Sequence, residues 1–186
     1  MLKTKIAVFV SGGGTNFEAL INAQENGKIP HGEIVLMVSS SRTAYALKRA
    51  ENHGIKSVVC SKKELGSQEK FEEEILKNLE ENDIQLIVLA GFMSILSNEF
   101  TKKYENRIIN IHPSLIPSFC GEGFYGLHVH EAALKKGVKV TGATVHIVNE
   151  IPDGGPIIMQ KAVYIEENDT PETVSYTHLR AHETSQ

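Results

Sequence analysis

The chain has 186 residues, of which 41% are hydrophobic and 23% are charged, and these values are ordinary for a globular domain with its own core. Its formal net charge of −4 provides no basic surface, which argues against nucleic acid and anionic membranes as partners. Two cysteines, Cys60 and Cys120, are too few for a disulfide framework and form no metal motif with the scattered histidines. We therefore expect a cytoplasmic protein that holds no metal.

Short apolar runs typical of strands alternate with helical patterns as far as residue 112. The expected strands are 5–10, 33–40, 56–60, 84–91 and 107–112, and the expected helices between them are 15–27, 44–54 and 67–84. The first apolar run is too short for a signal peptide, and no segment reaches the length of a membrane span. Strands separated by helices of this length predict right-handed βαβ units, and hence an α/β fold with a mostly parallel sheet.

The pattern changes towards the C-terminus. Two further strand candidates, 138–148 and 156–165, are joined by "NEIPDGG" without a helix between them, which predicts an antiparallel pair at one edge of the sheet. No repeat or linker divides the chain, so we expect one domain over residues 1–174. The tail 175–186 has no apolar periodicity, and we expect it to be non-native or truncated.

The first candidate site is "SGGGTN", residues 11–16, between the first strand and the first helix. Glycines in such a turn let backbone N–H groups approach an anion, and the helix N-terminus adds favourable partial charge. The loop is not a dinucleotide fingerprint, because Phe17 occupies the position of the third glycine, and it lacks the Gly-Lys-Ser/Thr of a P-loop. It binds a phosphate-sized anion, or it is a tight turn in which Thr15 or Asn16 caps the helix.

The second candidate site is "NIH", residues 110–112, at the end of a strand. Asn110 and His112 are two residues apart, so both side chains face the same side of an extended strand. An amide that can hold an oxyanion beside an imidazole that can move a proton suits acyl chemistry. Since ligands of open α/β sheets bind at the carboxyl ends of strands, this site and the glycine loop can share one crevice. The alternative is a pair of polar residues that merely ends a strand.

The third candidate site is "PDGGP", residues 152–156, which follows the strand that carries His146. Glycines between prolines make a stiff loop that permits close backbone approach, and Asp153 is its only charge. A carboxylate beside an imidazole orients the ring and favours its charged form. The alternative is a turn in which Asp153 hydrogen-bonds to its own backbone.

Six motifs occur together in one order and spacing, and they carry a family resemblance. They are "SGGGTN", "LAGFMSIL", "NIHPSLIPSF", "GLHVHEAAL", "TGATVHIV" and "DGGPII". Over residues 4–174 the chain resembles the phosphoribosylglycinamide formyltransferases, the folate-dependent enzymes of de novo purine synthesis. The resemblance implies a Rossmann-like formyltransferase fold. It also implies transfer of a formyl group from 10-formyltetrahydrofolate to the amine of 5-phosphoribosylglycinamide.

The resemblance also implies roles for individual residues. The catalytic residues would be Asn110, His112 and Asp153, and the substrate phosphate would bind to Gly14, Thr15 and Asn16. The folate pterin would contact Met93, Ile95 and Leu96, with a second segment that contains His146 on its other side.

Three alternatives remain beside this hypothesis. Methionyl-tRNA formyltransferase and formyltetrahydrofolate hydrolase have the same catalytic core, but each would add a domain that 186 residues do not accommodate. A non-catalytic nucleotide-binding module would use Asn110 and His112 only to end a strand. For an enzyme acting on small molecules we expect a monomer or a weak homodimer.

Overall fold

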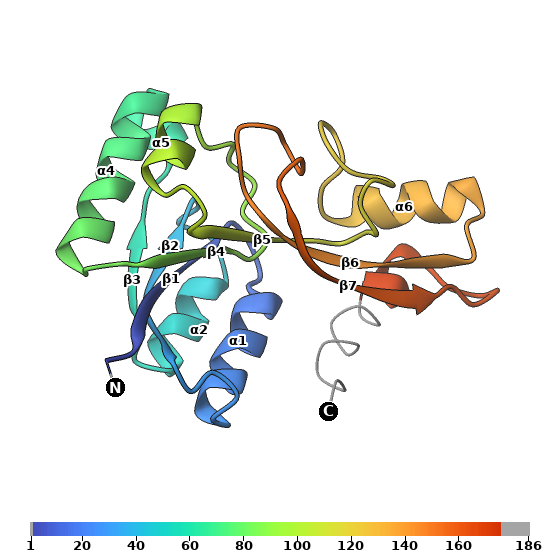
Figure 1. The fold of residues 1–186 in the computed structure, drawn as a ribbon, viewed down its shortest axis with the longest axis horizontal. Helices are drawn as coiled ribbons and strands as arrows, with labels where there is room; N and C mark the ends of the chain where they lie inside the picture. Colours follow the sequence, from blue (N-terminus) through green and yellow to red (C-terminus); the bar gives the residue numbers. More distant parts are fainter. Residues whose placement is uncertain (1, 176–186) are drawn as a thin grey trace. The chain divides into compact units, whose positions relative to one another are not determined.

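The computed structural model describes residues 2–175 (Figure 1). Apart from Ser175, the tail that we expect to be non-native lies outside these residues. Within residues 2–175, seven strands form one sheet in the order β3-β2-β1-β4-β5-β6-β7. The strands are β1 Thr4–Val10, β2 Gly32–Ser39, β3 Lys56–Val59, β4 Leu86–Leu89, β5 Ile108–His112, β6 Val140–Ile147 and β7 Ile157–Tyr164.

The strand pairing confirms the predicted fold class. β1 pairs in parallel with β2 on one side and with β4 on the other, and β2 pairs in parallel with β3. β6 and β7 are antiparallel, as the short connection between them predicts. All seven predicted strands are present, although β4 is shorter than the apolar run 84–91 at both ends.

The helices agree only partly with the sequence patterns. The helices that lie wholly within the described residues are α1 Thr15–Glu25, α2 Ala46–Asn52, α3 Lys62–Leu65, α4 Gln68–Glu81, α5 Asn98–Lys103 and α6 Leu127–Lys136, and residues 171–175 are helical too. We predicted α1, α2 and α4 but not α3, α5 or α6. The 4 residues of α3 and the 6 of α5 are too few to display a helical period. In the longer α6, Val129, His130 and Ala133 are buried, and a histidine among the buried residues hides the apolar period.

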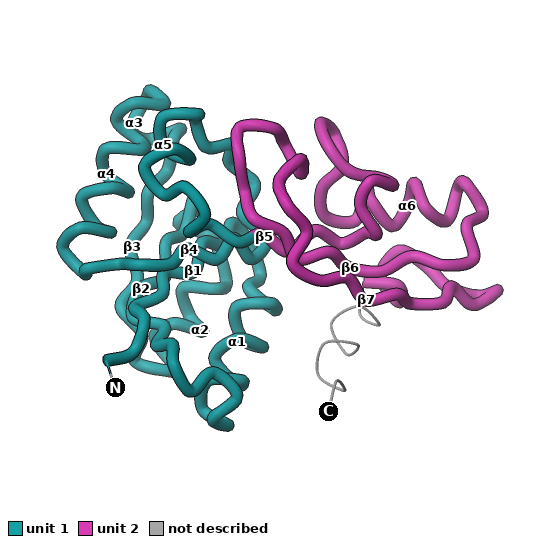
Figure 2. Tube along the Cα trace, in the orientation of Figure 1, with its two compact units in different colours: residues 1–109 teal, residues 110–186 magenta. Residues whose placement is uncertain are grey.

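The chain divides into two compact units, residues 1–109 and 110–186 (Figure 2). In the first, the side chains of β1 alternate between two apolar layers. Val8 and Val10 belong to a cluster with Phe17 and Ile21 of α1 and with Ala46 and Ala50 of α2. Phe9 lies edge-on to Phe92, which stacks on Phe71 of α4. Burial of each such large side chain contributes about 1.5–3 kcal/mol, so helices on both faces hold the ends of β1 and β4 in place.

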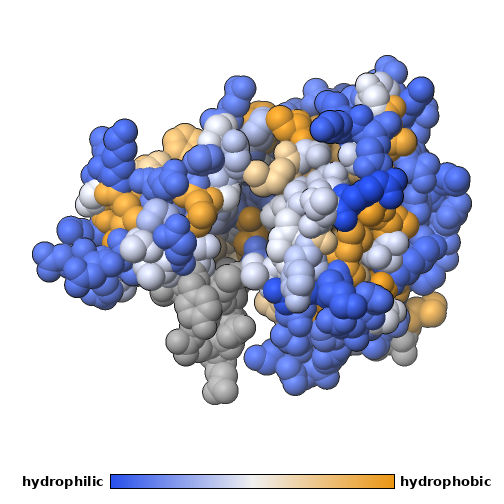
Figure 3. Space-filling view, turned by 180° about the vertical axis from the view of Figure 1, so that it is seen from behind, coloured by the Kyte–Doolittle hydropathy of each residue, from blue (hydrophilic) through white to orange (hydrophobic). Residues whose placement is uncertain are grey.

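The second unit contains the end of β5, together with α6, β6 and β7. Gly142 in β6 has no room for a side chain, because an added Cβ would collide with the carbonyl oxygen of Lys161 on β7. β7 is largely exposed, with Ile157, Ile158 and Met159 each about half accessible. The face in Figure 3 is mostly hydrophilic, and its hydrophobic residues lie in separate patches. Within residues 2–175, every helix is too short or too polar to span a bilayer.

Candidate active site

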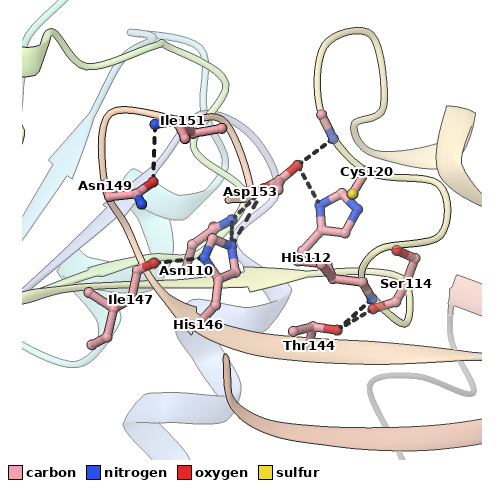
Figure 4. A network of polar contacts seen from close by, with 12 residues as sticks. Asn110, His112, Ser114, Cys120, Thr144, His146, Ile147, Asn149, Ile151 and Asp153 are labelled. Carbon is pink, nitrogen blue, oxygen red and sulfur yellow. Dashed lines mark hydrogen bonds and ion pairs between the residues drawn. The ribbon is translucent and has the colours of Figure 1, made fainter. Parts of the chain in front are cut away.

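Asn110, His112, His146 and Asp153 form one polar cluster in the second unit (Figure 4). β5 supplies Asn110 and His112, β6 supplies His146, and Asp153 lies in the loop between β6 and β7. The Asp153 carboxylate lies between the three others. Its Oδ2 is 3.4 Å from His112 Nδ1, and its Oδ1 is 3.4 Å from Asn110 Nδ2 and 3.5 Å from His146 Nε2. The structure therefore brings together the three residues expected to be catalytic and one expected to contact folate.

His112 is buried, with a side chain 4% exposed, and both ring nitrogens have neighbours. Its Nε2 lies 2.8 Å from the carbonyl oxygen of Phe119. A carbonyl oxygen only accepts, so Nε2 must carry the proton of that bond. Nδ1 faces Asp153 and is the ring atom that can exchange a proton, because Nε2 is engaged.

The amide of Asn110 is oriented by His146. The ring of His146 is 2% exposed, and its Nδ1 donates to the carbonyl oxygen of Ile147 at 2.9 Å. When the ring is neutral, Nε2 accepts from the Nδ2 group of Asn110 at 3.1 Å, whereas in the charged ring Nε2 carries a proton and faces Asp153 Oδ1 at 3.5 Å. The same Nδ2 donates to Asp153 over the longer distance of 3.4 Å, so the carboxylate holds the second amide hydrogen more loosely.

Asp153 has an unusual backbone and a well-satisfied carboxylate. Its φ of 54° lies in the left-handed region, which Asp adopts more readily than most residues. The N–H of Gly121 donates to Oδ2 at 2.9 Å. Burial opposes ionisation, but the hydrogen bonds from His146 and Gly121 and the positive charges of His112 and His146 outweigh it. The pKa of Asp153 therefore lies below its ordinary value, and the carboxylate is ionised at neutral pH.

A second set of hydrogen bonds orders the turn that carries the Phe119 carbonyl group. Ser114 Oγ donates to the carbonyl oxygen of Ser118 at 2.5 Å and lies 3.3 Å from that of Phe119, and Thr144 Oγ1 donates to the carbonyl oxygen of Ser114 at 2.7 Å. Phe119 itself has a φ of 49°. Sequence reasoning missed Phe119 and Gly121, because each contributes a backbone group that its residue type does not reveal.

The glycine loop in the first unit presents free backbone donors. Gly14, with a φ of 72°, is the N-cap of α1 and makes no side-chain capping bond, so neither Thr15 nor Asn16 caps the helix as the alternative required. The first backbone hydrogen bond of α1 runs from the N–H of Glu18 to the carbonyl oxygen of Gly14. Within residues 2–175, no hydrogen bond engages the N–H of Gly13, Gly14, Thr15 or Asn16. The loop therefore has the donors that an anion requires.

Met93, Ile95 and Leu96 lie in the same unit, in the connection between β4 and α5. Met93 and Ile95 are 52% and 77% exposed, while Leu96 is half-buried. The Met93 N–H donates to Ser11 Oγ at 2.8 Å, and Gln68 Nε2 donates to the Ile95 carbonyl at 3.0 Å. The segment thus presents apolar side chains on an anchored backbone.

Two carboxylate contacts complete this anchor. Glu72 of α4 is buried and accepts from both the N–H and the hydroxyl of Ser97, the residue that caps α5.

Among residues 2–175, no group of three or more His, Cys, Asp or Glu side chains is arranged to hold a metal ion.

Comparison with known proteins assigns the family. The model of the formyl transferase domain matches residues 4–185. The chain belongs to the formyl transferase family. Over 172 residues it is 41% identical to the phosphoribosylglycinamide formyltransferase of Bacillus subtilis, covering 91% of this chain and 84% of that one. Over 173 residues it is 47% identical to the trifunctional purine biosynthetic protein adenosine-3 of Gallus gallus, but this covers 93% of this chain and only 17% of the relative.

Solved formyl transferases share the fold. The phosphoribosylglycinamide formyltransferase of Bacillus halodurans superposes with a TM-score of 0.89 at 40% identity, covering 98% of this chain and 91% of that one. A formyltetrahydrofolate deformylase from Pseudomonas syringae superposes with a TM-score of 0.84 at 25% identity, covering 96% of this chain and 57% of that one. The fold is therefore shared by a protein named as a formyltransferase and by one named as a deformylase.

Proposed function

We propose that this formyl transferase moves a formyl group from 10-formyltetrahydrofolate to the primary amine of 5-phosphoribosylglycinamide. The observation that carries the proposal is the cluster of Asn110, His112 and Asp153, in which the carboxylate lies 3.4 Å from both the amide and the imidazole. The names of the Bacillus subtilis and Bacillus halodurans relatives support the choice of reaction.

The reaction forms one C–N bond and breaks another. The amine nitrogen of the ribotide attacks the formyl carbon, and the carbonyl oxygen takes up negative charge. The bond from the formyl carbon to N10 of the folate then breaks, the amine loses one proton and N10 gains one. No oxidant or metal is needed for this balance. The protein has to hold the oxyanion and move one proton.

The cluster supplies a group for each task. Asn110 would donate to the oxyanion with the amide hydrogen that Asp153 holds loosely, while its bond to His146 keeps the amide oriented. His112, when protonated, has Nδ1–H to donate or release, because Nε2–H stays bound to Phe119. Asp153 would stabilise the charged imidazole and relay a proton through water. Preorganised donors of this kind are effective because they need no reorganisation during the reaction.

The first unit carries the groups proposed for binding. Gly14, Thr15 and Asn16 would receive the ribotide phosphate on unpaired N–H groups. The exposed side chains of Met93 and Ile95 would contact the pterin ring. Leu96, on the same segment, would also contact the folate. In the second unit, His146 would contact the folate in addition to its hydrogen bond with Asn110.

The test is a transformylation assay that follows release of tetrahydrofolate. Asn110→Ala and His112→Ala should each lower kcat by about 10²–10³ with both substrates saturating, because each removes a donor to the oxyanion. His128→Ala is the matched control, since His128 is an exposed residue of α6 that pairs with Glu131, and it should leave kcat unchanged. Near-normal kcat in the Asn110 and His112 variants would contradict the mechanism.

The superposition with the deformylase favours a second candidate, in which water accepts the formyl group. The same assay separates the two functions. A transferase releases tetrahydrofolate only when the ribotide is present, whereas a deformylase releases it with the folate alone. Equal rates with and without the ribotide would replace transfer by hydrolysis.

A further inference from the structure

The carbonyl groups of the glycine loop are held from behind by α2. The N–H of Ala46 donates to the Gly12 carbonyl at 3.2 Å, and Arg49 Nε donates to the Gly13 carbonyl at 2.9 Å. The packing is close, because a Cβ added to Gly14 would lie 2.7 Å from Ala46 Cβ. Two successive carbonyls fixed against α2 determine the peptide planes that carry the N–H groups of Gly13 and Gly14.

Arg49 is itself fixed at three points. Besides the bond to Gly13, its NH1 lies 3.0 Å from Glu18 Oε2, and its guanidinium carbon lies 5.2 Å from the centre of the Tyr45 ring. The side chain is only 24% exposed. A planar guanidinium carries its donors on separate nitrogens of a rigid fork, whereas the three donors of lysine share one nitrogen at the end of a flexible stem.

The same contacts neutralise a charge that would oppose anion binding. Glu18 lies in the first turn of α1, next to the loop, where its carboxylate would repel a phosphate. Arg49 pairs with one of its oxygens, and His53 Nε2 lies 3.1 Å from the other. His53 Nδ1 contacts Glu25 at 2.9 Å, and the hydrogen bonds to Glu25 and Glu18 raise the pKa of His53. Arg49 and the charged form of His53, which its raised pKa favours, therefore both offset the negative charge of Glu18.

We propose that Arg49 is a positioning residue for substrate phosphate. It aims the N–H groups of Gly13 and Gly14 by holding the Gly13 carbonyl, and it offsets the charge of Glu18, without contacting the phosphate itself. The inference deepens the proposed function, because it rests on the assignment of this loop to the ribotide phosphate. A role confined to joining α1 and α2 would instead affect stability alone.

The test compares Arg49→Lys with the wild-type chain by calorimetry, using the ribotide and its phosphate-free riboside. Lysine keeps the charge near Glu18 but loses the fork, so ribotide affinity should fall about tenfold or more. Riboside affinity, KM for the folate and kcat should stay within about twofold, since the chemistry does not use the loop. Arg42→Lys is the matched control, because the exposed guanidinium of Arg42 pairs with Glu64 of α3, and it should behave as wild type.

Each remaining outcome has a definite meaning. Unchanged ribotide affinity in Arg49→Lys overturns the inference and leaves the proposed function standing. Equal loss of ribotide and riboside affinity, together with a lower Tm, also overturns it, because that pattern reports general damage. If the wild-type chain itself binds ribotide and riboside with equal affinity, the loop does not bind the phosphate. The phosphate-binding role proposed for Gly14, Thr15 and Asn16 then fails as well.

Discussion

Asp153 connects the members of the polar cluster, since Asn110, His112 and His146 all contact its carboxylate. Its negative charge lies beside the amide of Asn110 and the two imidazole rings, and it favours the charged form of each ring. Loss of that charge should therefore affect both the reaction and the stability of the fold. Aspartate and asparagine are nearly the same size, so Asp153→Asn isolates the charge from the shape.

We predict that Asp153→Asn lowers kcat about 10²-fold with little change in either KM, because the charged imidazole loses its partner. Stability provides a second readout. The pKa of Asp153 is depressed in the folded state, so its contribution is present above the pKa of an unfolded Asp and is lost as the pH falls through the folded value. Denaturation curves of the two chains should differ at neutral pH and converge in acid. A constant difference at every pH would contradict this linkage.

The turn between β1 and α1 gives a prediction about a secondary-structure element. Gly14 and Gly13 are neighbours, but only Gly14 is restricted to glycine by its backbone conformation and by the space around it. Gly14 has a φ of 72° and lies against Ala46, whereas a Cβ on Gly13 would meet no atom within 4 Å. Gly14→Ala combines a left-handed alanine with a steric clash, and we expect it to cost about 2 kcal/mol or more.

For a chain of this size that cost corresponds to a fall in Tm of about 4–8 °C. Gly13→Ala is the matched control and should unfold within about 1 °C of wild type, because its backbone suits any residue. Thermal unfolding followed by circular dichroism makes the comparison. A Gly14→Ala chain as stable as Gly13→Ala would mean that α2 does not constrain the loop.

The sequence predicted the elements that obey a simple period. Every strand was found, because an apolar run of β-rich residues is visible without its neighbours. α5 was missed, since its position depends on the bond of Ser97 to the buried Glu72, which lies 25 residues earlier. The extent of an element is thus set partly by tertiary contacts that a linear pattern does not contain.

The candidate site was predictable to a similar degree. Asn110 and His112 share one side of β5 because of strand geometry, and the structure places Asp153 and His146 beside them. The groups that orient them are backbone atoms of Phe119, Gly121 and Ile147, which residue types do not announce. Arg49 was missed for a related reason, since its partner is the carbonyl of a glycine.

Across the whole molecule, the proposed roles divide between the two compact units. Residues proposed to bind phosphate and folate lie mainly in residues 1–109, and those proposed for chemistry lie in residues 110–186. We therefore predict that Arg49→Lys raises KM for the ribotide at constant kcat, whereas Asn110→Ala lowers kcat at nearly constant KM. Steady-state kinetics of the double variant should give a loss in kcat/KM equal to the product of the two single losses. A loss much smaller than the product would show that the two residues act on one step.

Asp153 of the cluster and Phe119, whose carbonyl oxygen His112 contacts, both have left-handed backbone without being glycine, and we expect them to tolerate substitution differently. Phe119, with a φ of 49°, contributes only its carbonyl to His112, so a saturation library at this position should return active clones with Gly or Asn. Asp153, with a φ of 54°, contributes its side chain, so the same library should return Asp alone. Glu would carry the charge but suits neither the backbone nor the reach. With similar backbone conformations, Phe119 should thus tolerate substitution, whereas Asp153 should not.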